Sequence, residues 1–273
     1  MPIALPELTP LQETLWLTLC CRAIDNRSSH RILGDETADE IVRETGYDHS
    51  RFRIMAAGAL NVAHRAKKLD EIARRFFARH PRGVGLDLGA GLDSRVLRVS
   101  PPPEAEWYDL DFPEVIDLRR RLLPAAATPR GVAADLNEPG WLDALPADRP
   151  AVIVADGLLA FQSEEEMITL VDRLVGHFPS GEIAFNGYST FAVWAQKHYK
   201  GAESVARIAK FPGFNDPRTP ERWNPKLRLV KEILCMREPE VALFPPLLRW
   251  WTRLFAPSAT LSRSGNVVLH YRF

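Results

Sequence analysis

Residues Gly83–Arg98 read GVGLDLGAGLDSRVLR, in which an apolar run from Val84 to Leu88 reaches the glycines Gly89 and Gly91. A helical pattern follows the glycines, which gives the order of strand, tight turn and helix that opens a nucleotide-binding α/β unit. Glycine lets the backbone approach a ligand closely because it has no Cβ. The N-terminus of the helix would offer unpaired N–H groups to a polar or anionic group. We therefore expect the ligand cradle at this turn.

Composition limits the kinds of partner that the chain can take. Its 273 residues include 35 Lys and Arg and 35 Asp and Glu, so no net charge attracts nucleic acid or an anionic membrane, and we expect neither as a partner. The three cysteines, Cys20, Cys21 and Cys235, lack the spacing of metal ligands. They point to a reducing compartment, the cytoplasm. The first ten residues lack a leader pattern, and no run of about 18 apolar residues predicts a membrane span.

Helical patterns fill the first 80 residues. Leucines recur at helical spacing in Leu8–Ala23, a second helix is predicted over Asp35–Glu44, and a third region extends from Phe52 to Arg79 with a break expected near Gly58. The third region ends at His80, before Pro81. We interpret residues 1–80 as an N-terminal helical cap.

Strands and helices then alternate. Five apolar segments are predicted as strands: Val84–Leu88, Ala105–Asp109, Gly131–Ala134, Ala151–Ala155 and Glu182–Asn186. Alternation at this spacing indicates an α/β fold with a doubly wound, mostly parallel sheet, which we assign to a Rossmann-like core over residues 81–187.

The alternation stops after Tyr188. Aromatic residues such as Trp194, Phe211 and Trp223 lie among glycines, prolines and charges, so we expect an inserted lid or substrate segment over residues 188–240. These rings suit a flat, apolar acceptor, or they form the core beneath the lid. Residues 241–273 are expected to complete the core with C-terminal strands, the last over Asn266–Phe273.

The aromatic stretch Leu247–Phe255 (LLRWWTRLF) also matches an interfacial membrane helix. It holds only two arginines and no large polar face, so we do not favour that interpretation.

Carboxylates follow the predicted strands where an open α/β sheet binds its ligand. Asp109 and Asp111 stand about 20 positions beyond the glycines, where an acidic residue binds ribose hydroxyls. Asp111, before Phe112, is our choice, although it could also cap the next helix. Asp135 could accept from an adenine amino group or be a surface turn residue. Asp156 ends the buried fourth strand and is expected to face the site.

Two other ligand classes fit the turn less well. A dinucleotide fingerprint needs a third glycine where Ser94 stands. The pair Asp109 and Asp111 also resembles part of a metal site, but no third ligand is apparent and we expect no metal.

Six segments occur in a fixed order along the chain: Arg22-Ala23, Arg65 with Asp70, LGAGLDSR at 88–95, WYDLDFPEVIDLRRRLL at 107–123, AADLNEPGWLDAL at 133–145 and ADGLLAF at 155–161. Together they resemble the leucine carboxyl methyltransferase-like family, specifically its bacterial polyketide O-methyltransferase branch. The resemblance covers most of the chain from about Thr9 to Asn186 and the final strand. The combination in order is specific, although each segment alone is not.

The resemblance implies a class I S-adenosylmethionine-dependent O-methyltransferase that acts on a small, polyketide-like molecule. It implies that the cofactor carboxylate pairs with Arg65, that the glycine turn lies at the methionine part, and that Asp111 binds the ribose. The cofactor-binding residues expected on this basis are Arg65, Leu88, Gly89, Ala90, Gly91, Asp111, Phe112, Asp135, Leu136 and Asp156.

Two residues depart from the family pattern. Members of the family usually carry Glu-Gly and a nearby Tyr after the fourth strand, where this chain has Asp156 and Phe161. The shorter carboxylate could reach the cofactor ammonium through water, and loss of the hydroxyl could alter the acceptor pocket. These differences keep open a non-catalytic S-adenosylmethionine-binding protein. An NAD(P)-dependent oxidoreductase and methylation of a protein C-terminal carboxylate are further alternatives.

No residue stands out as a catalytic base. Tyr188 and His198 in the insert are the best candidates for the acceptor site, although a lid histidine can equally be structural. Arg22 could pair with an acidic acceptor or hold the core edge. A carboxylate acceptor needs no base at pH 7, whereas a phenol near pKa 10 would be helped by one. The absence of an evident base therefore favours a carboxylate acceptor slightly.

Overall fold

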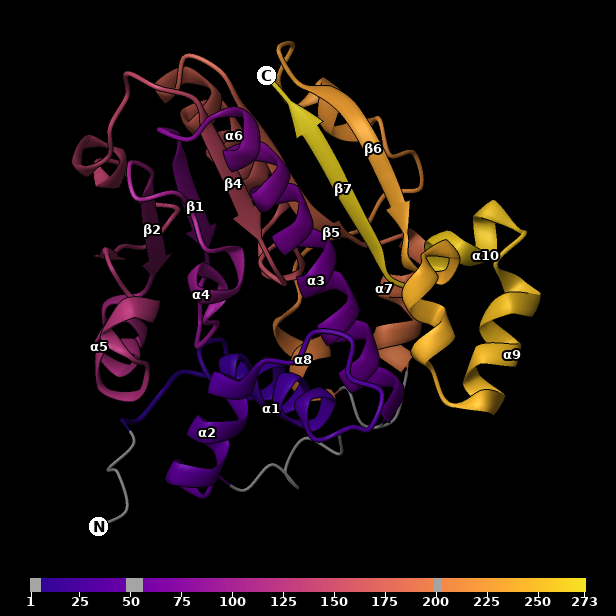
Figure 1. Cartoon of the computed structure of the whole chain (residues 1–273). Coiled ribbons are helices and arrows are strands. Elements are labelled where there is room, and N and C mark those ends of the chain that lie inside the picture. The colour runs from indigo at the N-terminus through magenta and orange to yellow at the C-terminus, as the bar shows by residue number, and fades with distance from the viewer. Residues whose placement is uncertain (1–5, 48–55, 199–202) are drawn as a thin grey trace.

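Seven strands form one sheet in the order β3-β2-β1-β4-β5-β7-β6 in the computed structural model, which describes residues 6–47, 56–198 and 203–273 (Figure 1). The strands are β1 (Val84–Leu88), β2 (Glu106–Asp111), β3 (Gly131–Ala133), β4 (Ala151–Ala155), β5 (Gly181–Gly187), β6 (Arg228–Leu234) and β7 (Val267–Arg272). Strands β1 to β5 pair in parallel, and β7 is antiparallel to β5 and β6. The expected doubly wound, mostly parallel sheet is confirmed.

Helices cover both faces of this sheet (Figure 1). The helices of the described chain are α1 (Thr14–Asn26), α2 (Glu36–Thr45), α3 (Ala56–Arg79), α4 (Arg95–Val99), α5 (Pro113–Leu122), α6 (Glu164–His177), α7 (Thr190–His198), α8 (Glu203–Ile208), α9 (Pro246–Phe255) and α10 (Ala259–Ser264), of which α9 and α10 lie to one side of the sheet.

Alternate residues of the central strand β4 divide the core into two layers. Val152 and Val154 pack in the cluster that includes Phe76 of α3, whereas Ile153 packs in the cluster that includes Leu170 of α6. Every residue of β4 is buried, as expected for a parallel strand covered on both faces. The carboxyl ends of β1 to β4 therefore meet at one edge of a rigid sheet.

The helices before the sheet differ in detail from the sequence prediction. Helix α1 begins at Thr14 rather than at Leu8, because residues 10–13 form turns. Asp35 caps α2 by accepting from the Ala38 N–H at 3.0 Å. Helix α3 continues through Gly58 without the expected break, and the predicted helical residues 52–55 lie outside the described part of the chain.

The segment 188–240 contains an element that the sequence prediction missed. Strand β6 lies within it and forms the edge of the sheet, with an irregular register between Leu229 and Lys231. Its burial does not alternate, because Val230 and Lys231 are both exposed and Ile233 and Leu234 are both buried, which is why period-two patterning did not reveal it. Phe211 and Trp223 pack in the core beside Phe185, so these rings form the core beneath the segment.

Candidate functional site

A cavity of about 510 Å³ opens where β1, β2, β3 and β4 end. Residues of α1, α3, α7 and α8 and the turn before β7 line its other sides. Nine of the residues expected to bind the cofactor line this one cavity: Arg65, Gly89, Ala90, Gly91, Asp111, Phe112, Asp135, Leu136 and Asp156. The expectation for Leu88 needs correction, because its side chain is 2% exposed and packs in the core beside α6 instead of lining the cavity.

The turn after β1 requires glycine at two positions. Gly89 has φ +66° and Gly91 has φ +48°, in the left-handed region that side chains disfavour. A Cβ on Gly89 would lie 3.3 Å from Leu158, and a Cβ on Gly91 would lie 3.3 Å from Leu15 of α1. The turn is therefore tightly enclosed between α1 and the segment that follows β4.

The helix after the turn does not provide the anion site that the sequence predicted. Helix α4 has five residues and begins at Arg95, which is buried, so its N-terminus lies beyond the glycines. The N–H groups of Gly89 and Ala90 both donate to the Leu110 carbonyl oxygen, at 2.9 and 3.1 Å. These two N–H groups are therefore hydrogen-bonded to β2 and are not free to bind an anion.

Asp111 ends β2 and faces the cavity. Its Oδ2 accepts from the Gly91 N–H at 2.7 Å, and its Oδ1 accepts from the Phe112 N–H at 2.8 Å. The N-cap of α5 is Phe112, so Asp111 lies one residue before the cap. Burial raises the pKa of Asp111, and the two N–H donors oppose that rise. A carboxylate fixed by backbone donors keeps further lone pairs for a ligand's hydroxyl groups.

Asp109 lies elsewhere. It is 1% exposed and binds Arg119 at 2.6 Å and the Trp107 indole N–H at 2.9 Å. Arg119 also donates to three carbonyl oxygens of the glycine turn region, those of Ala90, Gly91 and Asp93. Asp109 therefore supports the turn from beneath, and of the two candidates Asp111 is the one at the cavity.

The loop after β3 brings Asp135 and Leu136 to the cavity. Asp135 Oδ1 accepts from the Asn137 N–H at 3.0 Å, and Arg173 of α6 donates to the carbonyl oxygens of Leu136 and Asn137 at 3.3 and 2.9 Å. Both interactions fix the loop against the core, with Leu136 largely buried.

Arg65 of α3 and Asp156 at the end of β4 form an ion pair, with 2.6 Å between Arg65 Nε and Asp156 Oδ1. Burial disfavours the charged guanidinium, but Asp156, Tyr188 and Cys21 together oppose it, and the pKa of Arg65 is raised. Gly157 has φ +85°, and a Cβ there would lie 3.3 Å from Arg65 Nη2. The cavity thus presents one cation and one anion side by side, which suits a ligand with both an ammonium and a carboxylate.

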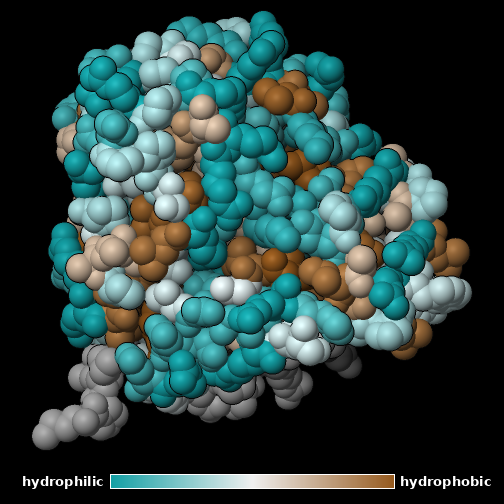
Figure 2. All heavy atoms as spheres, viewed as in Figure 1, coloured by the Kyte–Doolittle hydropathy of each residue, from teal (hydrophilic) through white to brown (hydrophobic). Residues whose placement is uncertain are grey.

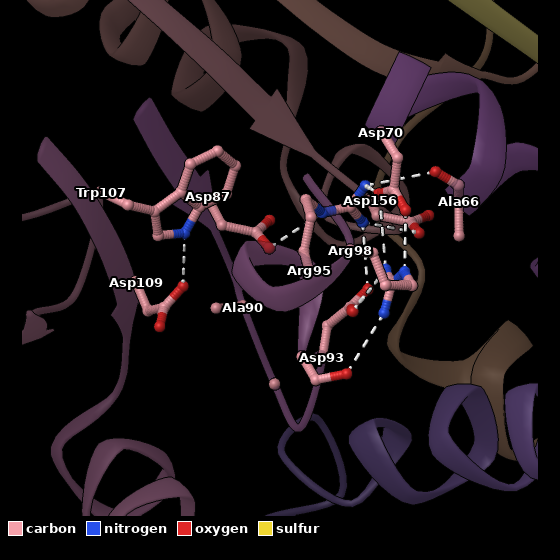
Figure 3. Close-up of polar contacts among 12 residues, drawn as sticks. Ala66, Asp70, Asp87, Ala90, Asp93, Arg95, Arg98, Trp107, Asp109 and Asp156 are labelled. Atoms are coloured by element: carbon pink, nitrogen blue, oxygen red, sulfur yellow. Dashed lines mark hydrogen bonds and ion pairs between the residues drawn. The ribbon is translucent and has the colours of Figure 1, made fainter. Parts of the chain in front are cut away.

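A buried ionic cluster supports this pair from behind (Figure 3). Arg95 is 1% exposed and contacts four carboxylates within 3.3 Å, namely Asp70, Asp87, Asp93 and Asp156. Arg98 joins Asp35, Asp70 and Asp93. The cluster links α3, β1, α4 and β4, so the orientation of Asp156 depends on residues from four elements.

The pKa values of two acids in the cluster are shifted in opposite directions. Burial raises the pKa of Asp87 to about 7, with Arg95 opposing and Asp93 adding to the rise. Burial acts on Asp93 in the same direction, but Arg22, Arg98 and Arg95 outweigh it and hold the pKa of Asp93 well below its ordinary value. Sequence reasoning missed this cluster because its acids come from separate elements, although the Asp-Ser-Arg run at 93–95 lay in the quoted motif.

Of the three residues expected at the acceptor, two line the cavity. Tyr188 is in the lining, and so is Arg22. Arg22 is only 2% exposed, and it donates to Asp35 and to the Leu92 carbonyl oxygen, both at 2.9 Å. These hydrogen bonds hold α1 against the glycine turn. Of the two roles considered for Arg22, they favour that of an arginine at the edge of the core over that of a partner for an acidic acceptor.

The expectation that His198 lies at the acceptor site needs correction, because His198 does not line the cavity. It lies exposed at the end of α7, where its Nδ1 is 2.8 Å from the Trp194 carbonyl oxygen and its ring stacks on Trp194 at 4.7 Å. The ring is thus bound to its own helix.

Gln162 is a lining residue that the sequence did not indicate. Its side chain is 8% exposed, and its buried Oε1 has no hydrogen-bond partner among the described residues. A buried amide oxygen without a partner is costly, so this atom marks a position where a ligand donor fits. The sequence did not reveal Gln162 as a site residue, because a glutamine after Phe161 belongs to no recognisable motif.

Neither metal ligation nor membrane crossing is found in the described ranges. No group of three or more His, Cys, Asp or Glu side chains in residues 6–47, 56–198 and 203–273 has a metal-binding arrangement. Over the same ranges no helix is both long and apolar enough to cross a bilayer.

The sequence is similar to those of known methyltransferases. The family model of leucine carboxyl methyltransferase matches residues 16–175. The tetracenomycin polyketide synthesis O-methyltransferase TcmP of Streptomyces glaucescens is 37% identical, over 89% of this chain and 90% of that protein. The S-adenosyl-L-methionine-dependent methyltransferase dpfgK of Gibberella zeae is 29% identical, over 85% and 84% of the two chains.

Solved structures support the fold. A methyltransferase-like protein of Thermobifida fusca superposes with a TM-score of 0.54 at 18% identity, over 92% of this chain and 93% of that one. The plantazolicin methyltransferase BamL, solved with a triazolic desmethylPZN analogue and SAH, gives a TM-score of 0.51 at 7% identity, over 96% of this chain and 98% of that one. At these identities the likeness shows the shared architecture alone.

Proposed function

The chain belongs to the leucine carboxyl methyltransferase family of S-adenosylmethionine-dependent methyltransferases. We propose that it methylates an oxygen of a small, polyketide-like acceptor. One observation carries the proposal: the glycine turn, Asp111, Asp135 and Asp156 come from four neighbouring strand ends and open into one cavity. The 37% identity to a polyketide O-methyltransferase supports the acceptor class.

The residues present fit the cofactor. We assign the ribose hydroxyls to Asp111, whose carboxylate is already oriented by the Gly91 and Phe112 N–H groups. We assign the adenine to Asp135 and Leu136, and the amino-acid end to the pair Arg65 and Asp156. Gly89, Ala90 and Gly91 leave backbone rather than side chains at the cavity wall.

Positioning is the main contribution of the chain to the reaction. S-adenosylmethionine supplies an activated methyl group when it is bound. The cavity walls hold the acceptor oxygen in line with that group and exclude water, which can supply roughly 7–11 kcal/mol of barrier reduction at best. Leu11 in the turn before α1, Leu17 of α1 and Ala192 of α7 give the apolar part of the wall.

A carboxylate is the acceptor oxygen that this lining suits best. The described lining contains no histidine, and its carboxylates are assigned to the cofactor or to the buried ionic cluster. A carboxylate acceptor is already ionised at pH 7 and needs no base, whereas a phenol near pKa 10 does not have that advantage. Tyr188 supplies a hydroxyl to orient the acceptor, whereas the lining hydroxyls of Thr14, Thr18 and Ser264 already donate to backbone carbonyl oxygens.

Two further assignments belong to this proposal. We infer that residues 1–80 form a cap and that residues 188–240 contribute to the acceptor wall, around a core of 81–187 that residues 241–273 complete together with β6. The lining residues of α1, α3 and α7 support this division. We place the reaction in the cytoplasm, because Cys20, Cys21 and Cys235 are free thiols.

A methyl-transfer assay tests the proposal. The protein is incubated with isotope-labelled S-adenosylmethionine and matched aromatic acceptors, naphthoic acid and naphthol, and the products are analysed by mass spectrometry. Label in a product that mild alkali releases as methanol identifies an ester and supports a carboxylate acceptor. Label in an alkali-stable ether would overturn the carboxylate assignment while retaining O-methylation. Cofactor binding without transfer to any polyketide-like carboxylic acid or phenol would support the non-catalytic alternative.

A further inference from the structure

Helix α9 turns its apolar side toward solvent. Leu247, Trp250, Trp251 and Leu254 are 71, 57, 45 and 54% exposed, and Phe255 is 37% exposed. Their spacing of three and four residues places them on one stripe of the helix. A surface helix ordinarily buries such a stripe, so α9 has the reverse orientation.

The opposite side of α9 attaches the helix to the protein. Thr252 is buried, and Leu248 packs against the small cluster that contains Val241 and Phe244. Arg249 donates to the Ala242 carbonyl oxygen at 3.0 Å. The helix is therefore fixed by its less apolar side, and the outward stripe is part of the folded structure.

Exposed apolar residues are concentrated on one group of helices. Eight of the ten large apolar side chains that are exposed in the described chain belong to α7, α9 and α10. In Figure 2 hydrophobic residues reach the surface at the right edge, where Figure 1 places α9 and α10. The end of α10 and the turn after it, Ser264, Gly265 and Asn266, line the cavity, as do Ala192 and Gln196 of α7. The apolar surface is thus continuous in sequence with a wall of the acceptor site.

The charge of this region has one sign. Residues 241–273, the last 33 of the chain, contain no Asp or Glu. Arg263 is paired with Glu232 at 2.7 Å, and no carboxylate among the described residues forms an ion pair with Arg249 or Arg253 of α9. Arg253 is exposed and lies at the border of the apolar stripe, whereas Arg249 lies on the attached side of the helix, where it donates to Ala242.

We propose that α9 docks on the surface of an anionic lipid bilayer, with its apolar stripe at the level of the headgroups and the exposed Arg253 toward lipid phosphates. Tryptophan and leucine on one side with arginine at the border is the composition of an interfacial helix. The helix has ten residues, about 15 Å, so it lies on a bilayer and does not span it. The proposal is independent of the acceptor chemistry.

A second copy of the chain suits this surface less well. A two-fold dimer built on α9 places the same surface on both sides of the interface. Arginines of both copies would then share an interface to which the segment 241–273 brings no acid, and like charges at an interface are unfavourable. A lipid surface with anionic headgroups has the complementary charge.

The structure also explains why the sequence argued against this interpretation. Leu247–Phe255 lacks the large polar face of a free interfacial helix. In the folded chain the protein itself covers that side of α9 through Leu248 and Thr252. A polar face is therefore not needed.

Vesicle flotation tests the proposal with the full chain. Wild-type protein is mixed with vesicles of phosphatidylcholine alone or with added phosphatidylglycerol, at low and at high NaCl. We expect flotation with the anionic vesicles, weaker flotation with neutral ones, loss at high salt, and a blue shift of tryptophan fluorescence. The double variant Trp250→Ser/Trp251→Ser should bind the anionic vesicles at least about tenfold more weakly than the wild type. Arg253→Gln should bind them roughly fivefold more weakly.

Val230→Ser is the matched control, because Val230 is 49% exposed on the edge strand β6 and outside this surface. It should float like the wild type, and all variants should bind S-adenosylhomocysteine like the wild type, which shows that they are folded. Equal flotation of Trp250→Ser/Trp251→Ser and wild type would overturn the proposal. It would also be overturned if the wild type failed to float and instead formed a dimer that the same double variant disrupts, because the stripe would then be an interface between two copies.

Discussion

The backbone N–H of Gly91 donates to Asp111 Oδ2 at 2.7 Å, which joins the turn after β1 to the end of β2. The two residues are 20 positions apart in the sequence, yet they form adjacent parts of the cavity wall. The bond holds the Asp111 carboxylate in place before any ligand arrives. A fixed acceptor loses little freedom on binding, and this preorganisation favours affinity.

Replacing Asp111 with Ala should weaken S-adenosylhomocysteine binding by roughly 1–3 kcal/mol, about 5- to 150-fold. The ribose hydroxyls would lose a charged acceptor, and the Gly91 N–H would lose its partner. Isothermal titration calorimetry measures the change. Asp117→Asn on the exposed side of α5 is the control, since Asp117 pairs with Arg120 at the surface and lies outside the cavity lining. An unchanged dissociation constant for Asp111→Ala would remove this residue from the site.

Replacing Gly91 with Val should abolish cofactor binding while the chain stays folded. The backbone at φ +48° would be strained by roughly 1–3 kcal/mol, and the new side chain would press on Leu15, 3.3 Å from its Cβ. Circular dichroism checks the fold and calorimetry checks the binding. Gly176→Ala is the matched control, because a Cβ there meets nothing within 4 Å. Retained binding by Gly91→Val would place the cradle elsewhere.

The raised pKa of Asp87 predicts a stability that depends on pH. Burial raises the pKa of this carboxyl to about 7 in the folded chain, above the value of about 3.9 in an unfolded chain. Its contribution to stability is therefore complete below about pH 4 and is lost as pH rises through 7, with a slope of at most about 1.4 kcal/mol per pH unit.

Urea unfolding of the wild type and of Asp87→Asn, measured from pH 5 to pH 8, checks this dependence. The amide cannot ionise, so the variant should lose less stability than the wild type as pH rises. Parallel pH profiles of the two proteins would show that Asp87 does not titrate in this range.

Replacing Gln162 with Leu should separate stability from acceptor binding. The change removes a buried amide oxygen that has no partner, so the unfolding free energy of the ligand-free protein should rise by about 1 kcal/mol. The carboxylates in the lining already supply the acceptors that we assign to the cofactor, so KM for the acceptor should increase while S-adenosylhomocysteine affinity stays the same. Weaker cofactor binding with an unchanged KM would place Gln162 at the cofactor instead.

The sequence predicted the central sheet because its determinants are local. Val84–Leu88 and Ala151–Ala155 are continuous apolar runs, and both are strands with those bounds. Asp111 and Asp135 were expected at the cavity because parallel strands end at the same edge of a sheet, and the structure brings both there. Ser163 and Glu166 form a capping box at the start of α6, which is likewise a local determinant, since the two residues are three positions apart.

The remainder depends on contacts between distant segments. The partners of Arg95 come from α3, β1, the glycine turn and β4, and no spacing along the chain relates Asp70 to Asp156. His198 was expected at the acceptor because it lies in the insert, but the direction of a helical side chain depends on how α7 packs. The outward stripe of α9 could not be read from its periodicity, since an apolar stripe has the same spacing whether it faces the core or solvent.

The central claim is that the cavity at the ends of β1 to β4 binds S-adenosylmethionine, and calorimetric titration with S-adenosylhomocysteine tests it most directly, with NADH as the control ligand. We predict saturable binding of one S-adenosylhomocysteine per chain and no heat of binding with NADH. Binding of NADH, or no binding of S-adenosylhomocysteine, would contradict the claim.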